Sequence, residues 1–69
     1  MDIIITDVGE EDAFYEYRHL LIGKRAKALM LIPNGEWYRG VVIFERDPIP
    51  YDEELLRYPF YAIKYAEAK

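Results

Sequence analysis

The stretch that most limits how this chain can fold runs from Gly23 to Glu45. Two apolar-rich runs of strand length flank the tripeptide Pro33-Asn34-Gly35. Asn-Gly accepts the positive backbone φ angles that tight hairpin turns need, and proline fixes its own φ for a turn. The pattern therefore predicts a central β-hairpin, with one strand over 24–32 and another that starts at Glu36.

The strand after the turn alternates between two faces. One face carries Tyr38, Gly40, Val42 and Phe44, and the other carries Trp37, Arg39, Val41 and Ile43. A glycine in the middle of a strand usually marks a bulge, or a bend where another backbone comes close. We therefore expect such an irregularity at Gly40.

Two further strands are predicted, one near each end of the chain. The β-branched run at Ile3 to Ile5 favours a strand over 2–7, and alternation from Phe60 to Tyr65 favours a last strand. Between the hairpin and this last strand, two prolines make residues 47–51 a loop. Residues 52–58 have an N-cap candidate and acids in their first turn, which indicates a short helical turn.

The segment from Glu10 to Leu21 fits two structures. Phe14, Tyr17 and Leu21 have helical spacing, acids lie at the start, and Gly23 offers a C-terminal stop, so one amphipathic helix is consistent. Phe-Tyr-x-Tyr is also typical of strand or loop. The alternative is an irregular arm that packs its aromatic rings on one end of a barrel.

At 69 residues the chain forms one domain, residues 1–69, close to the smallest size that folds without disulfides or metal. Aromatic residues make up 16% of it and must supply much of the core. Short strands, a glycine bend and at most one or two helical turns predict an all-β fold. A small five-stranded barrel is expected, because closure removes exposed strand edges.

The chain resembles the small SH3-like barrels of the Tudor and KOW kind, especially the short stand-alone versions of bacteria and their phages. The resemblance lies in residues 19–28, in Asn34-Gly35, in residues 37–44 and in residues 61–64. Such barrels are binding modules for peptides, modified side chains, RNA or other proteins, so the resemblance implies binding without naming the ligand. A phage-type inhibitor whose acidic surface mimics nucleic acid is one form this function would take.

Charge is distributed unevenly along the chain, whose net charge is −4. Residues 1–17 carry six acids and no base, whereas residues 18–46 carry six bases and two acids. The start of the chain lacks a basic segment followed by a long apolar one, and the longest apolar run, 28–33, is far too short to span a membrane. These features, together with the absence of cysteine, predict a cytoplasmic protein outside the membrane.

The residue inventory argues against catalysis. The chain has no Ser and no Cys, one Thr (Thr6) and one His (His19), so the nucleophile and base of a catalytic triad are missing. The carboxylates of Glu10, Glu11, Asp12 and Glu16 are interpreted as a solvated surface. We expect no enzymatic activity, no cofactor and no metal site, because neither calcium-loop spacing nor a zinc ligand set is present.

Exposed aromatic side chains make binding of a protein partner the leading hypothesis. Seven tyrosines are more than one small core can bury with satisfied hydroxyls, and exposed Tyr and Trp are typical of interface hot spots. The candidate protein-binding residues are Phe14, Tyr15, Tyr17, Trp37, Tyr38 and Tyr51.

Single-stranded nucleic acid is the alternative ligand. Basic residues Lys24, Arg25, Lys27 and Arg39 would form a stripe, with Trp37 and Tyr38 as platforms for stacked bases. The acidic pI near 4.8 opposes this, because binding to phosphates depends on basic surface. The same bases would instead neutralise the acidic segment 10–17.

Overall fold

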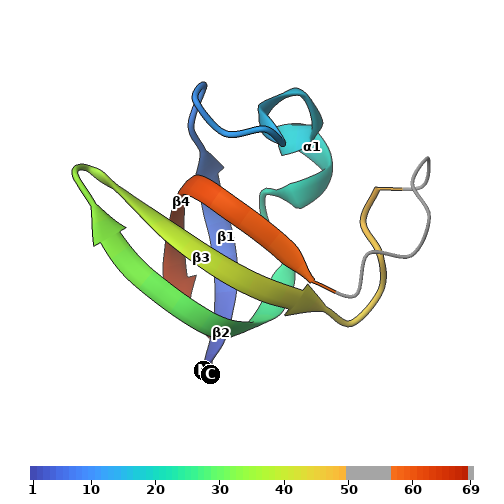
Figure 1. Cartoon of the computed structure of the whole chain (residues 1–69). Coiled ribbons are helices and arrows are strands. Elements are labelled where there is room, and N and C mark those ends of the chain that lie inside the picture. The colour runs from blue at the N-terminus through green and yellow to red at the C-terminus, as the bar shows by residue number, and fades with distance from the viewer. Residues whose placement is uncertain (50–56, 69) are drawn as a thin grey trace.

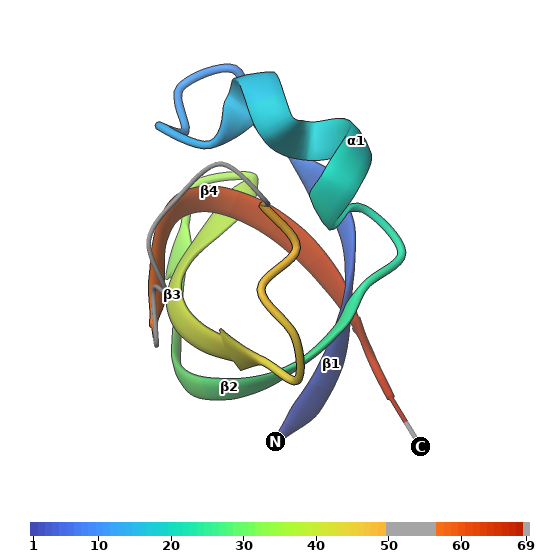
Figure 2. The same ribbon diagram turned by 90° about the vertical axis from the view of Figure 1, so that its right-hand side faces the viewer.

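In the described part of the chain, four antiparallel strands are joined into a closed ring in the order β1-β2-β3-β4. The computed structural model describes residues 1–49 and 57–68. The strands are β1 (Asp2–Val8), β2 (Arg25–Asn34), β3 (Trp37–Phe44) and β4 (Tyr58–Glu67). A 3-10 turn, η1 (Tyr15–Tyr17), and one turn of helix, α1 (Arg18–Leu21), lie between β1 and β2. Figures 1 and 2 show the ring from two directions, with the helical segment beside one end of it.

The prediction of five strands is wrong for the described residues, which hold four. The reason is the length of β2 and β4, which have ten residues each. The first part of β4 pairs with β3 up to Ile63, and its last part pairs with β1 from Ile63 to Glu67. One long curved strand thus has a different neighbour along each half, so fewer strands close the ring. The all-β class is confirmed at this coarser level.

The predicted hairpin is present, but its turn lies one residue further along than expected. Pro33 and Asn34 belong to β2 and pair with Tyr38 and Trp37, so the loop consists of Gly35 and Glu36. Gly35 has a φ of 66°, whereas no described residue other than glycine has a positive φ. A positive φ at the first loop residue alone is the pattern of a type II′ turn, which glycine favours.

Gly40 lies at a close approach of β2 and β3, beside irregularities in the pairing, as predicted. A Cβ atom added to it would lie 2.8 Å from the Met30 carbonyl oxygen and 2.8 Å from the Leu31 side chain. The pairing of β3 with β4 changes register between Tyr38 and Gly40, and that of β2 with β3 between Ala28 and Met30. Only a residue without a side chain fits this position without movement of β2.

The core lies inside the ring and follows the alternation expected from the sequence. On β3, Gly40 and Val42 are buried while Tyr38 and Phe44 pack against the core, so the face that these four residues were predicted to share is the inner one. The other buried apolar residues come from the other three strands and from the segments between the strands: Ile3, Ile5, Val8, Leu21, Ala26, Ile49, Tyr58, Phe60, Ala62 and Ile63.

The segment before β2 combines the two structures that its sequence allowed. Residues 10–14 are turns, and only 15–21 are helical. Gly23, with a φ of 89°, follows the helix end, in agreement with its predicted role as a stop. Phe14 and Tyr17 pack against the core, with the Phe14 ring centroid 5.3 Å from those of Tyr58 and Phe60. We call residues 10–17 the arm.

Part of the chain between β3 and β4 lies outside the described residues. The predicted loop over 47–51 is non-strand as far as Ile49, which is fully buried. Most of the helical turn predicted over 52–58 falls on residues 50–56, and Tyr58 itself is the first residue of β4. In the described ranges, the helical segments are too short to cross a bilayer.

Candidate functional site

Two of the six aromatic candidates for protein binding meet at one cavity. Tyr15 from the arm and Trp37 from the start of β3 line it together, and both rings are partly exposed. Phe14, Tyr17 and Tyr38 instead pack against the core, with Tyr38 at 4.9 Å from Tyr65 between ring centroids. Tyr51 lies outside the described residues. The structure therefore directs attention to the cavity, which we call the Trp37 recess.

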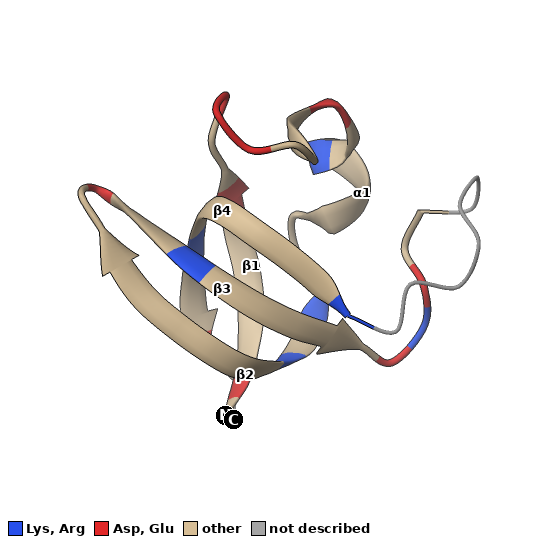
Figure 3. Ribbon diagram, in the orientation of Figure 1, with Lys and Arg blue, Asp and Glu red and all other residues tan. Residues whose placement is uncertain are grey.

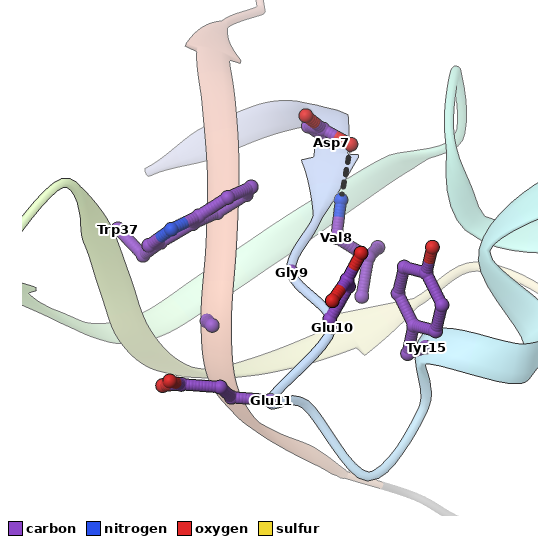
Figure 4. Close-up of a pocket in the computed structure, with 8 residues that line it drawn as sticks. Asp7, Val8, Gly9, Glu10, Glu11, Tyr15 and Trp37 are labelled. Carbon is purple, nitrogen blue, oxygen red and sulfur yellow. Dashed lines mark hydrogen bonds between the residues drawn. The ribbon is translucent and has the colours of Figure 1, made fainter.

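The Trp37 recess combines aromatic walls with carboxylates. Its volume is about 470 Å³. Figure 4 shows Trp37 on one side and Tyr15 on the other, with the end of β1 and the start of the arm between them. The lining residues are Asp7, Val8, Gly9, Glu10, Glu11, Tyr15, Trp37 and Ala62. Three of these are acids and none is a base, so the recess is suited to a cationic group with an apolar stem.

Gly9 determines how closely Trp37 approaches the end of β1. A Cβ atom added at Gly9 would lie 3.0 Å from the Ala62 Cβ atom and 3.3 Å from the Trp37 ring. The Gly9 backbone N–H also donates to the Ala62 carbonyl at 2.8 Å, which fixes this segment on β4. The indole therefore lies directly against backbone, as one wall of the recess.

Asp12 holds the arm onto β4. Asp12 as a whole residue is only 4% exposed. One oxygen accepts hydrogen bonds from the backbone N–H groups of Tyr61 and Ala62, both at 2.8 Å, and the other accepts from Phe14 at 2.9 Å. Charge-assisted bonds of this kind are roughly twice as strong as neutral ones. Asp12 thus positions Glu10, Glu11 and Tyr15, although it does not line the recess itself.

Both aromatic rings of the recess are already in contact with a cation of the same chain. The Arg18 guanidinium lies 4.1 Å from the centre of the Tyr15 ring, and Arg18 also donates to the Tyr15 carbonyl at 3.0 Å. The Lys64 ammonium lies 4.6 Å from the Trp37 ring. Cation–π attraction is therefore present at both walls, and it orients the two rings.

The predicted basic stripe is divided by the fold. Lys27 pairs with Ile43, whereas Arg39 pairs with Ile32, five residues further along β2. At about 3.3 Å per residue, Lys27 and Ile32, the β2 residue beside Arg39, are separated by roughly 16 Å along the strand. Arg25 forms a salt bridge with Asp2 at 3.2 Å. Figure 3 shows the arm's acids at one end of the ring, away from the bases at the start of β2.

Sequence reasoning missed the two residues that build the recess. The prediction of solvated surface is wrong for Asp12, because a run of acids taken together does not distinguish this buried carboxylate from Glu10 and Glu11. Gly9 follows the first predicted strand, and its local sequence indicates nothing beyond the end of that strand. A usable signal was the pattern Asp-x-Phe at 12–14, since an aspartate commonly accepts a bond from the backbone two residues later.

Comparison with known proteins identifies no relative of this chain. No protein-family model, curated protein or solved structure matches the chain. Within residues 1–49 and 57–68, no three His, Asp or Glu side chains are grouped so that they could hold a metal ion. The function must therefore be inferred from the recess and from the surface around it.

Proposed function

We propose that this protein is a small non-enzymatic binding module that engages a protein partner at the Trp37 recess. The observation that carries the proposal is the pairing of two partly exposed rings, Tyr15 and Trp37, with three carboxylates in one cavity. Tyr and Trp dominate interface hot spots, and carboxylates beside aromatic rings favour a cationic guest. The partner therefore presents a lysine or arginine side chain.

We also propose that the barrel belongs to the SH3-like class. Support comes from the closed order of antiparallel strands, the close approach at Gly40 and the helical turns between β1 and β2. Barrels of that class act as binding modules, which agrees with a role in recognition. The class adds no information on the partner, so the chemistry of the recess remains the basis of the proposal.

Single-stranded nucleic acid is the less favoured ligand. Trp37, its proposed stacking platform, lies beside Asp7, Glu10 and Glu11, which would repel phosphates. Arg39 is separated from the other three bases of the predicted stripe, and its guanidinium lies 5.8 Å from the Tyr61 ring centre. No observation of the described surface favours this alternative enough to make it a second proposal.

Selection of peptides from a random display library tests the proposal. We expect the selected peptides to share a Lys or Arg, and the best of them to change the fluorescence of Trp37, which is the only tryptophan. Replacement of that Lys or Arg by neutral norleucine or citrulline should weaken binding about tenfold or more, because cation–π and carboxylate contacts are both lost.

Variants of the protein locate the contact. Trp37→Ala and the double variant Glu10→Gln/Glu11→Gln should each weaken peptide binding about tenfold. Glu45→Gln, an exposed acid outside the recess, is the matched control and should leave affinity unchanged. Peptides without a basic residue, or equal losses with the control, would contradict the proposal. Salt-sensitive binding of a single-stranded oligonucleotide in place of peptides would favour the nucleic-acid alternative.

A further inference from the structure

Lys64 projects from the outer face of the sheet between Asp7 and Trp37. Val8 and Ile63 are paired across β1 and β4, and both are buried in the core. Because side chains alternate along a strand, the neighbouring pair, Asp7 and Lys64, points outward. Trp37 starts β3 on the other side of β4, and its indole reaches across that strand towards Asp7 (Figure 4). Lys64 is thus placed between two residues that line the Trp37 recess.

The Lys64 ammonium occupies the indole that a cationic guest would use. It lies 4.6 Å from the centre of the Trp37 ring. A Cβ atom at Gly9 would lie 3.3 and 3.4 Å from the two carbons that the fused rings of the indole share. Ring atoms surround both carbons, so only a group above the plane of the indole can approach the two together. Gly9 therefore covers one face of the indole, and the Lys64 ammonium takes up part of the surface that remains for a cation.

The charge of Lys64 also opposes a cationic guest, and its side chain is free to move. Lys64 does not line the recess, but it pairs with Asp7, whose carboxylate does. Directly paired residues of antiparallel strands are only about 5 Å apart between Cα atoms. Lys64 is exposed, and among the described residues its ammonium has neither a hydrogen bond nor an ion pair. An exposed cation–π contact is weak enough to be exchanged for another cation.

We propose that Lys64 is an internal competitor of the partner's lysine or arginine, and that the guest binds the Trp37 recess by displacing the Lys64 ammonium from the indole. This inference rests on the proposed function, because it concerns what limits affinity at the same recess. Arg18 differs from Lys64 in this respect, since it also donates a hydrogen bond to the Tyr15 carbonyl at 3.0 Å. Lys64 is therefore the cation that a guest replaces, whereas Arg18 stays in place.

Titration of the whole chain with the capped pentapeptide Gly-Gly-Lys-Gly-Gly, followed by NMR, tests the competition. Lys64→Met should bind the peptide about two- to fivefold more tightly than the wild type, because the competing cation–π contact is lost. Lys64→Arg keeps a cation at this position and should bind the peptide no more tightly than the wild type. A gain in affinity for both variants, or for neither, would overturn the proposal.

Lys27→Met is the matched control, because it changes the net charge of the chain by the same amount. Lys27 pairs with Asp2 and Lys64 pairs with Asp7, so at about 3.3 Å per residue the two lysines are separated by roughly 16 Å along β1. That distance exceeds the Debye length of about 8 Å at physiological salt. Lys27→Met should therefore leave the affinity for the peptide unchanged. Equal gains for Lys27→Met and Lys64→Met would show a general charge effect and overturn the proposal.

Proton signals of the Lys64 side chain report its displacement directly. Protons near the face of an indole are shifted upfield by its ring current, so these signals should be upfield in the free protein and at ordinary positions in Trp37→Ala. Saturation with the lysine peptide should move them to the same ordinary positions in the wild type. Signals that stay upfield in the complex would show that the guest and Lys64 bind the indole together, which would overturn the proposal.

The role of Lys64 and the proposed function fail in different ways. If neither the wild type nor Lys64→Met binds the lysine peptide better than its norleucine analogue, recognition of a cation at the recess fails, and the competition fails with it. If both proteins prefer the lysine peptide and bind it equally tightly, the proposed function stands and only the role of Lys64 is overturned.

Discussion

The arm and the β2–β3 hairpin are attached to the same ring in different ways. The arm depends on a few side chains: three hydrogen bonds to the Asp12 carboxylate and the packing of Phe14 on the core. The hairpin depends on a backbone ladder from Ala26 to Asn34 and on the close crossing at Gly40. A few side-chain contacts can be removed by one substitution, whereas a ladder is lost only when the backbone is displaced.

The same difference bears on the Trp37 recess. The recess exists because the arm is held against β4, so its shape follows the state of Asp12. Substitutions in the arm should therefore weaken recognition of a basic side chain even where the backbone ladder of the hairpin is intact.

The largest expected effect comes from Asp12→Ala. It leaves three backbone N–H groups without an acceptor: that of Ala62 is buried, and those of Phe14 and Tyr61 are partly buried. Each unsatisfied buried donor costs about 1 to 3 kcal/mol, so we expect a loss of about 3 kcal/mol in the free energy of unfolding. Urea denaturation measures this loss.

The neighbouring acid Glu11 provides the control for Asp12. Glu11→Ala removes an exposed carboxylate of the same segment. It should change the free energy of unfolding by no more than about 0.5 kcal/mol. A loss below about 0.5 kcal/mol for Asp12→Ala as well would show that the arm does not depend on this carboxylate. The contrast between arm and hairpin would then fail.

Gly40→Ala tests the hairpin side of the comparison. The added Cβ would lie 2.8 Å from the Met30 carbonyl oxygen, and backbone cannot move aside as a flexible side chain can. Overpacking of this kind costs about 1 to 3 kcal/mol, and we expect about 2 kcal/mol by urea denaturation. Neutral behaviour of Gly40→Ala would mean that β2 and β3 are less tightly apposed than the structure indicates.

The sequence predicted the hairpin better than it predicted the arm, and the reason is the range of the interactions. Gly40 and the alternation of β3 are local patterns, so the division of β3 into two faces and the close approach at Gly40 were predicted correctly. Asp12 accepts bonds from residues 49 and 50 positions away, and no local signal marks such a partner. The turn was misplaced by one residue because Pro33 was assigned to it, although proline is accepted on an edge strand.

The number of strands and the recess also depend on long-range geometry. The sequence shows where strands occur but not how far each one curves, and the curvature of β4 lets it serve two neighbours. Trp37 and Tyr15 were both named as candidates, yet their meeting depends on Gly9 and Ala62, which belong to different strands or their ends. Residue types were therefore predictable and their grouping was not.

Substitutions at Gly35 should lower the free energy of unfolding less than substitutions at Gly40 do, and for a different reason. Nothing lies within 4 Å of a Cβ added at Gly35, but its φ of 66° is unfavourable for other residues. Gly35→Ala should cost about 1 kcal/mol, whereas Gly35→Asn should cost less, because asparagine accepts this conformation more readily. Thermal unfolding of the pair measures the difference. Equal losses would indicate that the turn changes type.

The smallest effect on stability is expected for Gly9→Ala, where two contributions oppose each other. The new Cβ would meet the Ala62 side chain at 3.0 Å and the Trp37 ring at 3.3 Å, which is unfavourable. Replacement of glycine also lowers the conformational entropy of the unfolded chain, and this stabilises the folded protein by about 0.4 to 1 kcal/mol. The net change in the free energy of unfolding should stay within about 0.5 kcal/mol.

Trp37 should nevertheless move outward in Gly9→Ala, and its fluorescence emission should shift to longer wavelength. A loss as large as that of Gly40→Ala would mean that the recess wall is as rigid as the hairpin crossing, and that the arm and hairpin do not differ in this respect.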